Sequence, residues 1–235
     1  MKTWQIIAIV AVICAIGIGV MLWSKKDESK VDNYNDLSDQ MKPESENNNS
    51  NQQNNSNMNT ETTDGFDIKD KFVTLSVQGF GDIKVELYEE DAPKTVENFL
   101  RLTQKGYYDN LTFHRIAKDF VIQGGDPTGT GSGGESAFGS TFEDELNPNT
   151  ASYKAGYQKG VLAMANRGPN TNTSQFFIML DNVSLPNNYT IFGKVIAGLD
   201  VVDKIGAVPI TPQMGPTDGT PQQKIVITKA TISDQ

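Results

Sequence analysis

The chain has 235 residues, of which 37% are hydrophobic and 21% are charged, and its net charge is −9. This length is enough for one sizeable domain with appendages. The acidic balance argues against sequence-independent nucleic-acid binding, which needs a basic surface. A single cysteine, Cys14, excludes an intrachain disulfide and any cysteine-built zinc or iron–sulfur site. A single histidine, His114, excludes a multi-histidine metal centre.

Residues 1–23 are expected to anchor the chain in the cell membrane by a single pass. Residues 5–23 carry no charge and are almost wholly apolar. As a helix they would span about 28 Å, close to the hydrocarbon core of a bilayer. A cleaved signal peptide is the alternative, but the run is longer than a usual signal-peptide core and no A-x-A site follows it. A short N-terminal tail before a long domain favours a domain outside the cytoplasm.

Residues 24–66 are expected to form a disordered, acidic tether. Within 43–63, 16 of the 21 residues are Asn, Gln, Ser or Thr, and none is aromatic or branched aliphatic. Such a stretch cannot bury enough apolar area to offset the entropy lost on ordering. The tether therefore separates the anchor from the rest of the chain.

Residues 67–235 are expected to form the folded domain. Two helices are predicted, one starting near Pro93 and ending before Gly106, the other over 199–205. Many short strands with few helices favour an all-β sandwich or barrel. The predicted strands are 72–77, 83–88, 120–123, 161–166, 175–180, 190–195 and 225–232.

The glycine-rich stretch 124–139 formally contains a G-x-G-x-x-G pattern and the spacing of a phosphate-binding loop. Glu135, however, stands where the phosphate-binding lysine must be, and a carboxylate there would repel phosphate. The stretch is therefore interpreted as a surface loop whose glycines permit positive φ, and no nucleotide partner is expected.

The sequence offers no convincing candidate for a catalytic nucleophile. His114 lies in an apolar run without the glycines of a nucleophile elbow, and it is interpreted as a hydrogen-bonded structural residue. Glu143 and Glu145 are two residues apart and lack a flanking aromatic platform for a sugar. They are interpreted as a solvated acidic turn rather than a glycosidase pair.

Six short motifs occur in order through the domain. They are Phe113-His114-Arg115-Ile116, Phe120-Val121-Ile122-Gln123-Gly124-Gly125-Asp126, Met164-Ala165-Asn166, Gly168-Pro169-Asn170-Thr171-Asn172, Ser174-Gln175-Phe176-Phe177-Ile178 and Ile191-Phe192-Gly193-Lys194-Val195. Together they resemble the cyclophilin-type peptidyl-prolyl isomerases over essentially all of 67–235. The resemblance implies a closed eight-stranded antiparallel β-barrel capped by two helices, with a proline-containing polypeptide bound on its outer face. Rotation about an X-Pro bond breaks no covalent bond, so no metal or cofactor is expected.

The resemblance also implies which residues form the site. Arg115 would donate to the proline nitrogen as the bond twists, a role that stabilises the transition state more than the planar ground state. Phe120 and Gln123 complete the expected catalytic set. The expected substrate-binding residues are Val121, Ala165, Asn166, Gln175, Phe177, Leu185 and Tyr189. Without the motif context, Arg115 would be interpreted as an ordinary surface residue in a salt bridge, and Phe120 and Phe177 as barrel core.

Three positions depart from the family pattern. Val121 stands where many cyclophilins have methionine, Ser184 lies near the usual pocket tryptophan, and Tyr189 aligns with a common histidine. We expect weak inhibition by cyclosporin as a consequence. The expected function is isomerisation of X-Pro bonds in unfolded or exported proteins. The alternative is a chaperone or assembly module that binds proline-containing segments with little catalysis.

Overall fold

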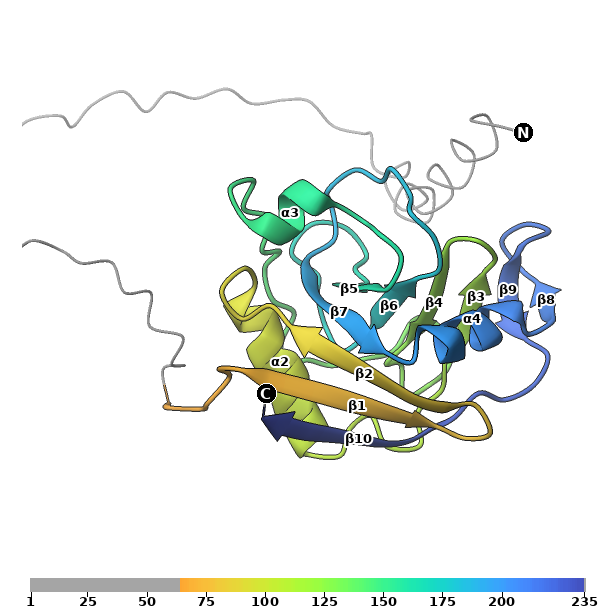
Figure 1. Ribbon diagram of the computed structural model, residues 1–235, viewed down its shortest axis with the longest axis horizontal. Coiled ribbons are helices and arrows are strands. Elements are labelled where there is room, and N and C mark those ends of the chain that lie inside the picture. The colour runs from red at the N-terminus through yellow and green to blue at the C-terminus, as the bar shows by residue number, and fades with distance from the viewer. Residues whose placement is uncertain (1–63, 235) are drawn as a thin grey trace, which may run out of the picture. The chain divides into compact units, whose positions relative to one another are not determined.

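The computed structural model describes residues 64–234, which form one antiparallel sheet and three short helices (Figure 1). The strands are β1 (Lys71–Val77), β2 (Gly81–Leu87), β3 (Arg115–Ala117), β4 (Val121–Gly124), β5 (Val161–Met164), β6 (Phe176–Met179), β7 (Ile191–Ala197), β8 (Ile210–Pro212), β9 (Asp218–Pro221) and β10 (Ile227–Asp234). The helices are α2 (Pro93–Gln104), α3 (Ala151–Ala155) and α4 (Leu199–Ala207). The expected anchor and nearly all of the expected tether lie outside the described residues. Within 64–234, no helix has the length and apolar character needed to cross a membrane.

The strand order is β10-β1-β2-β7-β5-β6-β4-β3-β9-β8. The prediction of a closed eight-stranded barrel is therefore wrong, because the sheet has ten strands and β10 and β8 form two separate ends. The β8–β9 hairpin forms the end of the sheet next to β3, because β9 pairs with β3. The segment before β3 meets the chain around the start of β10 through individual hydrogen bonds, Phe113 N to Ile225 O (3.0 Å) and Ile227 N to Leu111 O (2.8 Å).

Side chains alternate between two apolar clusters across the central strands. In β6, Phe176 and Ile178 enter the main core, whereas Phe177 and Met179 enter a second cluster on the opposite face, called here the outer cluster. Strands β4 and β5 alternate in the same way, as expected for a period of two, and so do Ile191 and Phe192 at the start of β7, although Val195 further along β7 also enters the main core. The main-core residues of these three strands are Ile122, Leu162, Met164, Phe192 and Val195, and their outer-cluster residues are Val121, Val161, Ala163 and Ile191.

The main core is closed by helix α2, as the apolar spacing of the sequence predicts. Pro93 begins the helix, and Gly106, with φ of +70°, follows its end. Phe99 is fully buried, and its ring centroid lies 4.9 Å from that of Tyr108 and 5.2 Å from that of Phe192. Aromatic pairs at these distances add to the stability gained by burial alone.

The first turn of α2 is capped by a residue distant in sequence. Ala92, at the N-cap position, provides no side-chain acceptor. Glu145 does so instead, accepting hydrogen bonds from the backbone nitrogens of Lys94 (3.0 Å) and Thr95 (2.8 Å). Burial raises the pKa of Glu145, although the bonds from Thr95 oppose this effect. The prediction of a solvated acidic turn is wrong for Glu145, while Glu143 pairs with Lys94 on the exposed surface.

The sequence prediction missed helix α3 and strands β3, β8 and β9. Each spans only three to five residues, which is too short to show a clear hydrophobic period. Helix α4 was predicted, and it begins after Gly198, whose φ is +86°. A Cβ atom on Gly198 would lie 2.1 Å from the carbonyl oxygen of Asp82, so this turn admits glycine alone without displacing the backbone.

We expect Glu145→Ala to lower the free energy of unfolding by about 1–2 kcal/mol, because two backbone donors of α2 lose their acceptor. The matched control is Glu143→Ala, which removes only an exposed ion pair and should change stability by less than about 0.5 kcal/mol. Urea unfolding followed by circular dichroism at pH 7 measures both. Equal effects of the two substitutions would contradict the capping role.

Candidate functional site

Arg115 is the first residue of β3, and two neighbouring strands fix its guanidinium group. Its Nε and Nη2 atoms donate to the two carboxylate oxygens of Asp218 on β9, at 2.8 and 2.6 Å. Its Nη1 donates to Oε1 of Gln123 on β4, at 2.8 Å. The side chain of Asp218 is 4% exposed and that of Arg115 is 16% exposed. A bidentate pair in this partly buried setting holds the guanidinium plane in one orientation.

The polar network continues from Arg115 to the glycine-rich loop. Gln123 donates from Nε2 to Oε1 of Gln175 (2.9 Å), which precedes β6. Gln175 in turn donates from Nε2 to the carbonyl oxygens of Gly131 (3.0 Å) and Gly133 (2.7 Å). Because each amide accepts on one side and donates on the other, donation runs in a single direction, from Arg115 through both glutamines to the carbonyl oxygens of the loop. Gln123 and Gln175 are therefore placed to orient Arg115.

The glycine-rich loop is held from its other side by a buried carboxylate. Asp126 accepts hydrogen bonds from the backbone nitrogens of Thr128, Gly131 and Gly133, at 2.8, 2.6 and 3.1 Å. Burial alone would raise the pKa of Asp126, but these hydrogen bonds outweigh it and the pKa is lowered. Gly131 has φ of +83°, so the expectation that glycines permit positive φ here is confirmed. The loop is thus an organised part of the site.

An apolar surface lies on the same face as Arg115. In the β3–β4 pair, Arg115 is opposite Gln123 and Ala117 is opposite Val121, so all four side chains point to one side. Ala117 and Val121 belong to the outer cluster. The predicted residues Phe120, Val121, Phe177, Leu185 and Tyr189 all lie in or against this cluster. The structure therefore brings the predicted apolar residues together next to the predicted arginine.

Two tyrosines contribute to the outer cluster: Tyr157 belongs to it and Tyr189 packs against it. The rings of Phe177 and Tyr189 meet edge to face, with centroids 5.5 Å apart. The hydroxyl of Tyr157 donates to the carbonyl oxygen of Tyr189 (2.9 Å) and accepts from its backbone nitrogen (3.1 Å). Burial raises the pKa of Tyr157 to about 12, so this hydroxyl keeps its proton at neutral pH. The sequence analysis did not select Tyr157, which lies outside the six motifs.

Ala165 and Asn166 lie just beyond the end of β5. The backbone nitrogen of Ala165 donates to the carbonyl oxygen of Gln175 (2.9 Å). The side-chain amide of Asn166 donates to the carbonyl oxygen of Asn188 (2.9 Å), next to Tyr189. Asn166 thereby ties the end of β5 to the segment that carries Tyr189. Both residues border the outer cluster, which Ala165 contacts directly.

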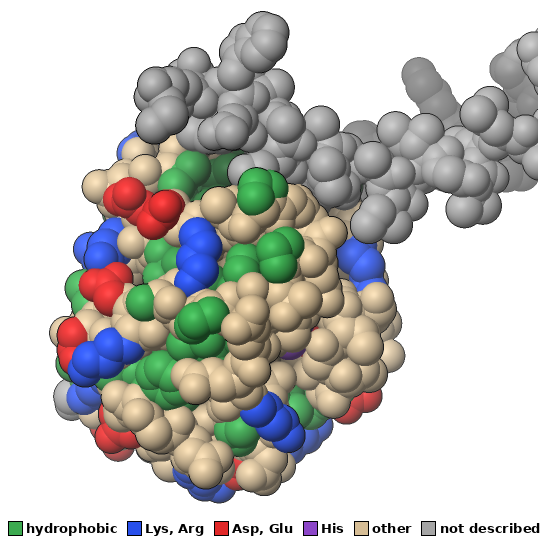
Figure 2. Space-filling view, turned by 90° about the vertical axis from the view of Figure 1, so that its right-hand side faces the viewer, with side chains coloured by type: hydrophobic (Ala, Val, Ile, Leu, Met, Phe, Trp, Pro, Cys, Tyr) green, Lys and Arg blue, Asp and Glu red, His purple; other side chains and the backbone are tan. Residues whose placement is uncertain are grey.

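Asp218 is the functional residue that sequence reasoning missed. No motif surrounds it, and it becomes visible only because β9 pairs with β3, placing Asp218 opposite Ala117. Gly219 permits the close pairing of β9 with β8 in their hairpin, because a Cβ atom there would lie 2.0 Å from the carbonyl oxygen of Thr211 on β8. In the turn before Asp218, Met214 is 39% exposed. Seen from the side where β8, β9 and α4 lie, hydrophobic side chains reach the surface in patches among Lys and Arg (Figure 2).

The remaining candidates do not form a metal or nucleophilic centre. Among residues 64–234, no group of three His, Cys, Asp or Glu side chains gathers as a metal site. His114 is buried, and neither ring nitrogen meets the full geometry of a hydrogen bond among the described residues, whereas a backbone hydrogen bond with Thr112 opposes the lowering of its pKa by burial. Its interpretation as a hydrogen-bonded structural residue stays a prediction. Cys14 lies outside the described residues.

Comparison with known proteins places this chain in a family. The family model described as cyclophilin type peptidyl-prolyl cis-trans isomerase/CLD matches residues 72–232. The chain belongs to the cyclophilin-type peptidyl-prolyl cis-trans isomerases. It is therefore an isomerase, and the family predicted from the six motifs is confirmed.

Relatives and solved structures agree with this assignment. The chain is 53% identical to peptidyl-prolyl cis-trans isomerase CYP18-2 of Arabidopsis thaliana over 137 residues, covering 58% of this chain and 80% of the relative. It is 51% identical to human peptidyl-prolyl cis-trans isomerase-like 1 over 139 residues, covering 59% and 81%. The crystal structure of a Cryptosporidium parvum cyclophilin-type isomerase matches at 40% identity with a TM-score of 0.61, covering 70% of this chain and 98% of that one. A second structure of that protein, in the presence of the dipeptide Ala-Pro, matches with a TM-score of 0.60.

We expect Asp218→Asn to lower kcat/KM for a proline-containing peptide by about ten- to a hundred-fold, because Arg115 loses the charged group that fixes its plane. The control is Asp203→Asn, which removes an exposed ion pair with Lys159 and should leave kcat/KM within about two-fold. Exchange between the cis and trans peptide measured by NMR, with urea unfolding to confirm folding, gives both values. An unchanged rate in folded Asp218→Asn would show that Gln123 alone positions Arg115.

Proposed function

We propose that this cyclophilin accelerates rotation about X-Pro bonds in unfolded or exported proteins, using Arg115 as the donor to the proline nitrogen. The observation that carries this function is a guanidinium group fixed by Asp218 and Gln123 beside an apolar surface. An X-Pro unit has the matching parts, an apolar ring and an imide nitrogen that becomes basic only when the bond twists. The relative studied with Ala-Pro gives independent support, because that dipeptide is the simplest such unit.

The barrier to rotation about a peptide bond is about 18–20 kcal/mol because resonance stiffens the C–N bond. Twisting removes the conjugation and localises a lone pair on nitrogen. A hydrogen bond from Arg115 to that lone pair exists only in the twisted state, so it lowers the barrier rather than tightening ground-state binding. The guanidinium stays charged at physiological pH. Its fixed orientation means that little reorganisation is needed when the bond twists.

The outer cluster is the proposed binding surface for the proline ring. Phe177 is 6% exposed, while Phe120, Leu185 and Tyr189 are only partly buried, so their edges are available for contact. The backbone of Ala165 and Asn166, past the end of β5, is the proposed place where the substrate adds as a short extended segment. Gln123 and Gln175 hold Arg115 above this surface.

We expect Arg115→Ala to lower kcat/KM for cis–trans exchange in a short proline peptide by about a hundred-fold or more, the usual effect of removing one transition-state donor. Arg115→Lys should recover only part of the rate, because an ammonium cannot form the bidentate pair with Asp218. The control is Arg101→Ala, since Arg101 also pairs with a carboxylate, on helix α2 away from the site. It should keep kcat/KM within about two-fold.

Two results of this assay would contradict the proposal in different ways. Full activity of Arg115→Ala would remove Arg115 from its proposed role. A wild-type chain that binds the peptide but accelerates exchange no better than buffer would support the alternative, a module that binds proline-containing segments.

We further propose that the domain is tethered outside the cytoplasm by residues 5–23, which supports action on exported chains. The support is the uncharged apolar run of those residues and the polar stretch 43–63 that follows it. Protease added to intact cells should cut within 43–63 and release a fragment that contains residues 67–235. Protection of the domain in intact cells, with cleavage after lysis, would contradict this arrangement.

A further inference from the structure

A carboxylate outside the Arg115 network, Asp144, organises the segment that follows β5. The backbone nitrogen of Asn170 donates to its Oδ2 (2.8 Å), and its own backbone nitrogen donates to Oδ1 of Asn170 (2.9 Å). The Oδ1 atom of Asp144 accepts from the side-chain amides of Asn172 (2.7 Å) and Asn166 (3.3 Å). Three donors from the segment 166–172 therefore converge on one half-buried carboxylate.

The two acidic neighbours of Asp144 have different partners. Glu143 forms an exposed ion pair with Lys94, and Glu145 caps helix α2. Of the three consecutive carboxylates, Asp144 alone is hydrogen-bonded to a predicted substrate-binding residue, Asn166. Its position in the chain therefore gives a matched comparison, because an adjacent residue carries the same charge and makes no contact with that segment.

The segment 166–172 is anchored at its far end by a buried asparagine. Asn172 is fully buried, and its side-chain amide also donates to the carbonyl oxygen of Phe142 (3.2 Å). The backbones of Asn172 and Phe142 exchange two further hydrogen bonds, at 3.2 and 3.3 Å. Asp144 lies two residues from Phe142, so its carboxylate is held by the same pairing that holds the segment.

The side chain of Asn166 is fully engaged within the protein. Its amide nitrogen donates to Asp144 and to the carbonyl oxygen of Asn188, and its Oδ1 accepts from the backbone nitrogen of Gly168 (3.3 Å). Its backbone N–H and carbonyl, in contrast, make no hydrogen bond to any residue within 64–234. The side chain therefore holds the residue in place, and the backbone is left for an extended substrate.

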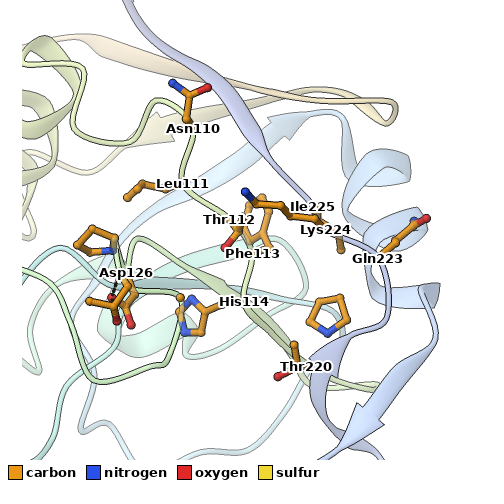
Figure 3. Close-up of a pocket in the computed structure, with 14 residues that line it drawn as sticks. Asn110, Leu111, Thr112, Phe113, His114, Asp126, Thr220, Gln223, Lys224 and Ile225 are labelled. Carbon is orange, nitrogen blue, oxygen red and sulfur yellow. Dashed lines mark hydrogen bonds between the residues drawn. The ribbon is translucent and has the colours of Figure 1, made fainter.

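Asp126 provides a parallel within the same molecule. Figure 3 shows it beside His114 at the wall of a cavity of about 370 Å³, and its carboxylate fixes the glycine-rich loop through backbone donors. Asp144 does not line this cavity. The two carboxylates thus organise two separate segments, one connected through Gln175 to Arg115 and the other carrying Asn166.

We propose that Asp144 is a positioning residue of the isomerase, which holds the backbone of Asn166 in place beside Tyr189 for binding of an extended X-Pro segment. The bond from Asn166 to Asn188 completes the link, because Asn188 is adjacent to Tyr189. This role rests on the proposed function, since it concerns the substrate of the same site. Contacts to the Asn166 backbone form whether the X-Pro bond is planar or twisted, so weakening them raises KM and leaves kcat unchanged.

Asp144→Asn is the first test, because an amide cannot replace a carboxylate that accepts on both oxygens. Its NH₂ group must face either the backbone nitrogen of Asn170 or the side-chain amides of Asn166 and Asn172, which sets donor against donor. We expect Kd and KM for the uncharged peptide acetyl-Ala-Ala-Pro-Ala-amide to rise about five-fold or more, with kcat within about two-fold. NMR titration of the full chain gives Kd, and cis–trans exchange of the peptide gives kcat and KM.

The control is Glu143→Gln, which removes the same charge one residue away and breaks only the exposed pair with Lys94. It should leave Kd and KM within about two-fold. An equal rise in both variants would mean that the effect comes from net charge, and would refute the role of Asp144.

The route through Asn166 is tested by a double-mutant cycle. Asn166→Ala removes its bond to Asp144 and keeps those of Asn170 and Asn172, so we expect a similar rise in Kd. Adding Asp144→Asn to Asn166→Ala should then raise Kd by less than about two-fold more, because both substitutions break the same link. Fully additive effects would refute this route. Urea unfolding checks that each variant folds, and if Asp144→Asn does not, a wild-type Kd in folded Asn166→Ala refutes the proposal.

The measurements separate this inference from the proposed function. Lower kcat with unchanged Kd in Asp144→Asn would refute the positioning role and leave the isomerase function in place. A wild-type chain that binds the peptide without accelerating exchange would refute the proposed function. A rise in Kd confined to Asp144→Asn and Asn166→Ala in that chain would still support the role of Asp144 in binding.

Discussion

The alternation of side chains along strands buried on both faces is the constraint on which the other features depend. In β6, adjacent Phe176 and Phe177 face opposite ways, one into the main core and one into the outer cluster. A shift of register by one residue would exchange these two roles, exposing core aromatics and removing the apolar surface beside Arg115. The register that stabilises the fold therefore also determines which side chains form the apolar surface of the proposed proline site.

Arg115 shows how a long, charged side chain becomes a fixed donor. A partly buried guanidinium needs acceptors, and they come from Asp218 on β9 and Gln123 on β4, 103 and 8 residues away in sequence. Asp218 compensates the charge, while Gln123 connects Arg115 to Gln175 and the glycine-rich loop. Without these partners the side chain would sample many rotamers, and a hydrogen bond to a twisted imide would carry an ordering cost. The loop, with Asp126 on one side and Gln175 on the other, extends that rigidity beyond the strands.

The sequence grouped the candidate site residues where they lie in contiguous motifs. Val121 and Gln123 lie on β4 with Phe120 just before it, and Phe177 lies on β6 with Gln175 just before it, so short patterns were enough to group them. The sequence failed where function or stability depends on one distant residue. Asp218, Tyr157 and Glu145 each act on a partner at least 32 residues away. Their immediate neighbours give no signal of these contacts, which arise only when separate strands and loops meet.

By itself the sequence determined the family, the predominance of strands, the position of helix α2 and most of the residues around the proposed proline site. These follow from local patterns of apolar residues, turn residues and motifs. Only the tertiary structure decided that the sheet has ten strands and two ends, because β8 and β9 are too short to show a period and are defined by pairing with β3. Only the tertiary structure gave Arg115 its charged partner and Glu145 the helix that it caps. In each case the deciding energy comes from burying a polar group beside its partner, and that depends on how the chain packs rather than on the order of neighbouring residues.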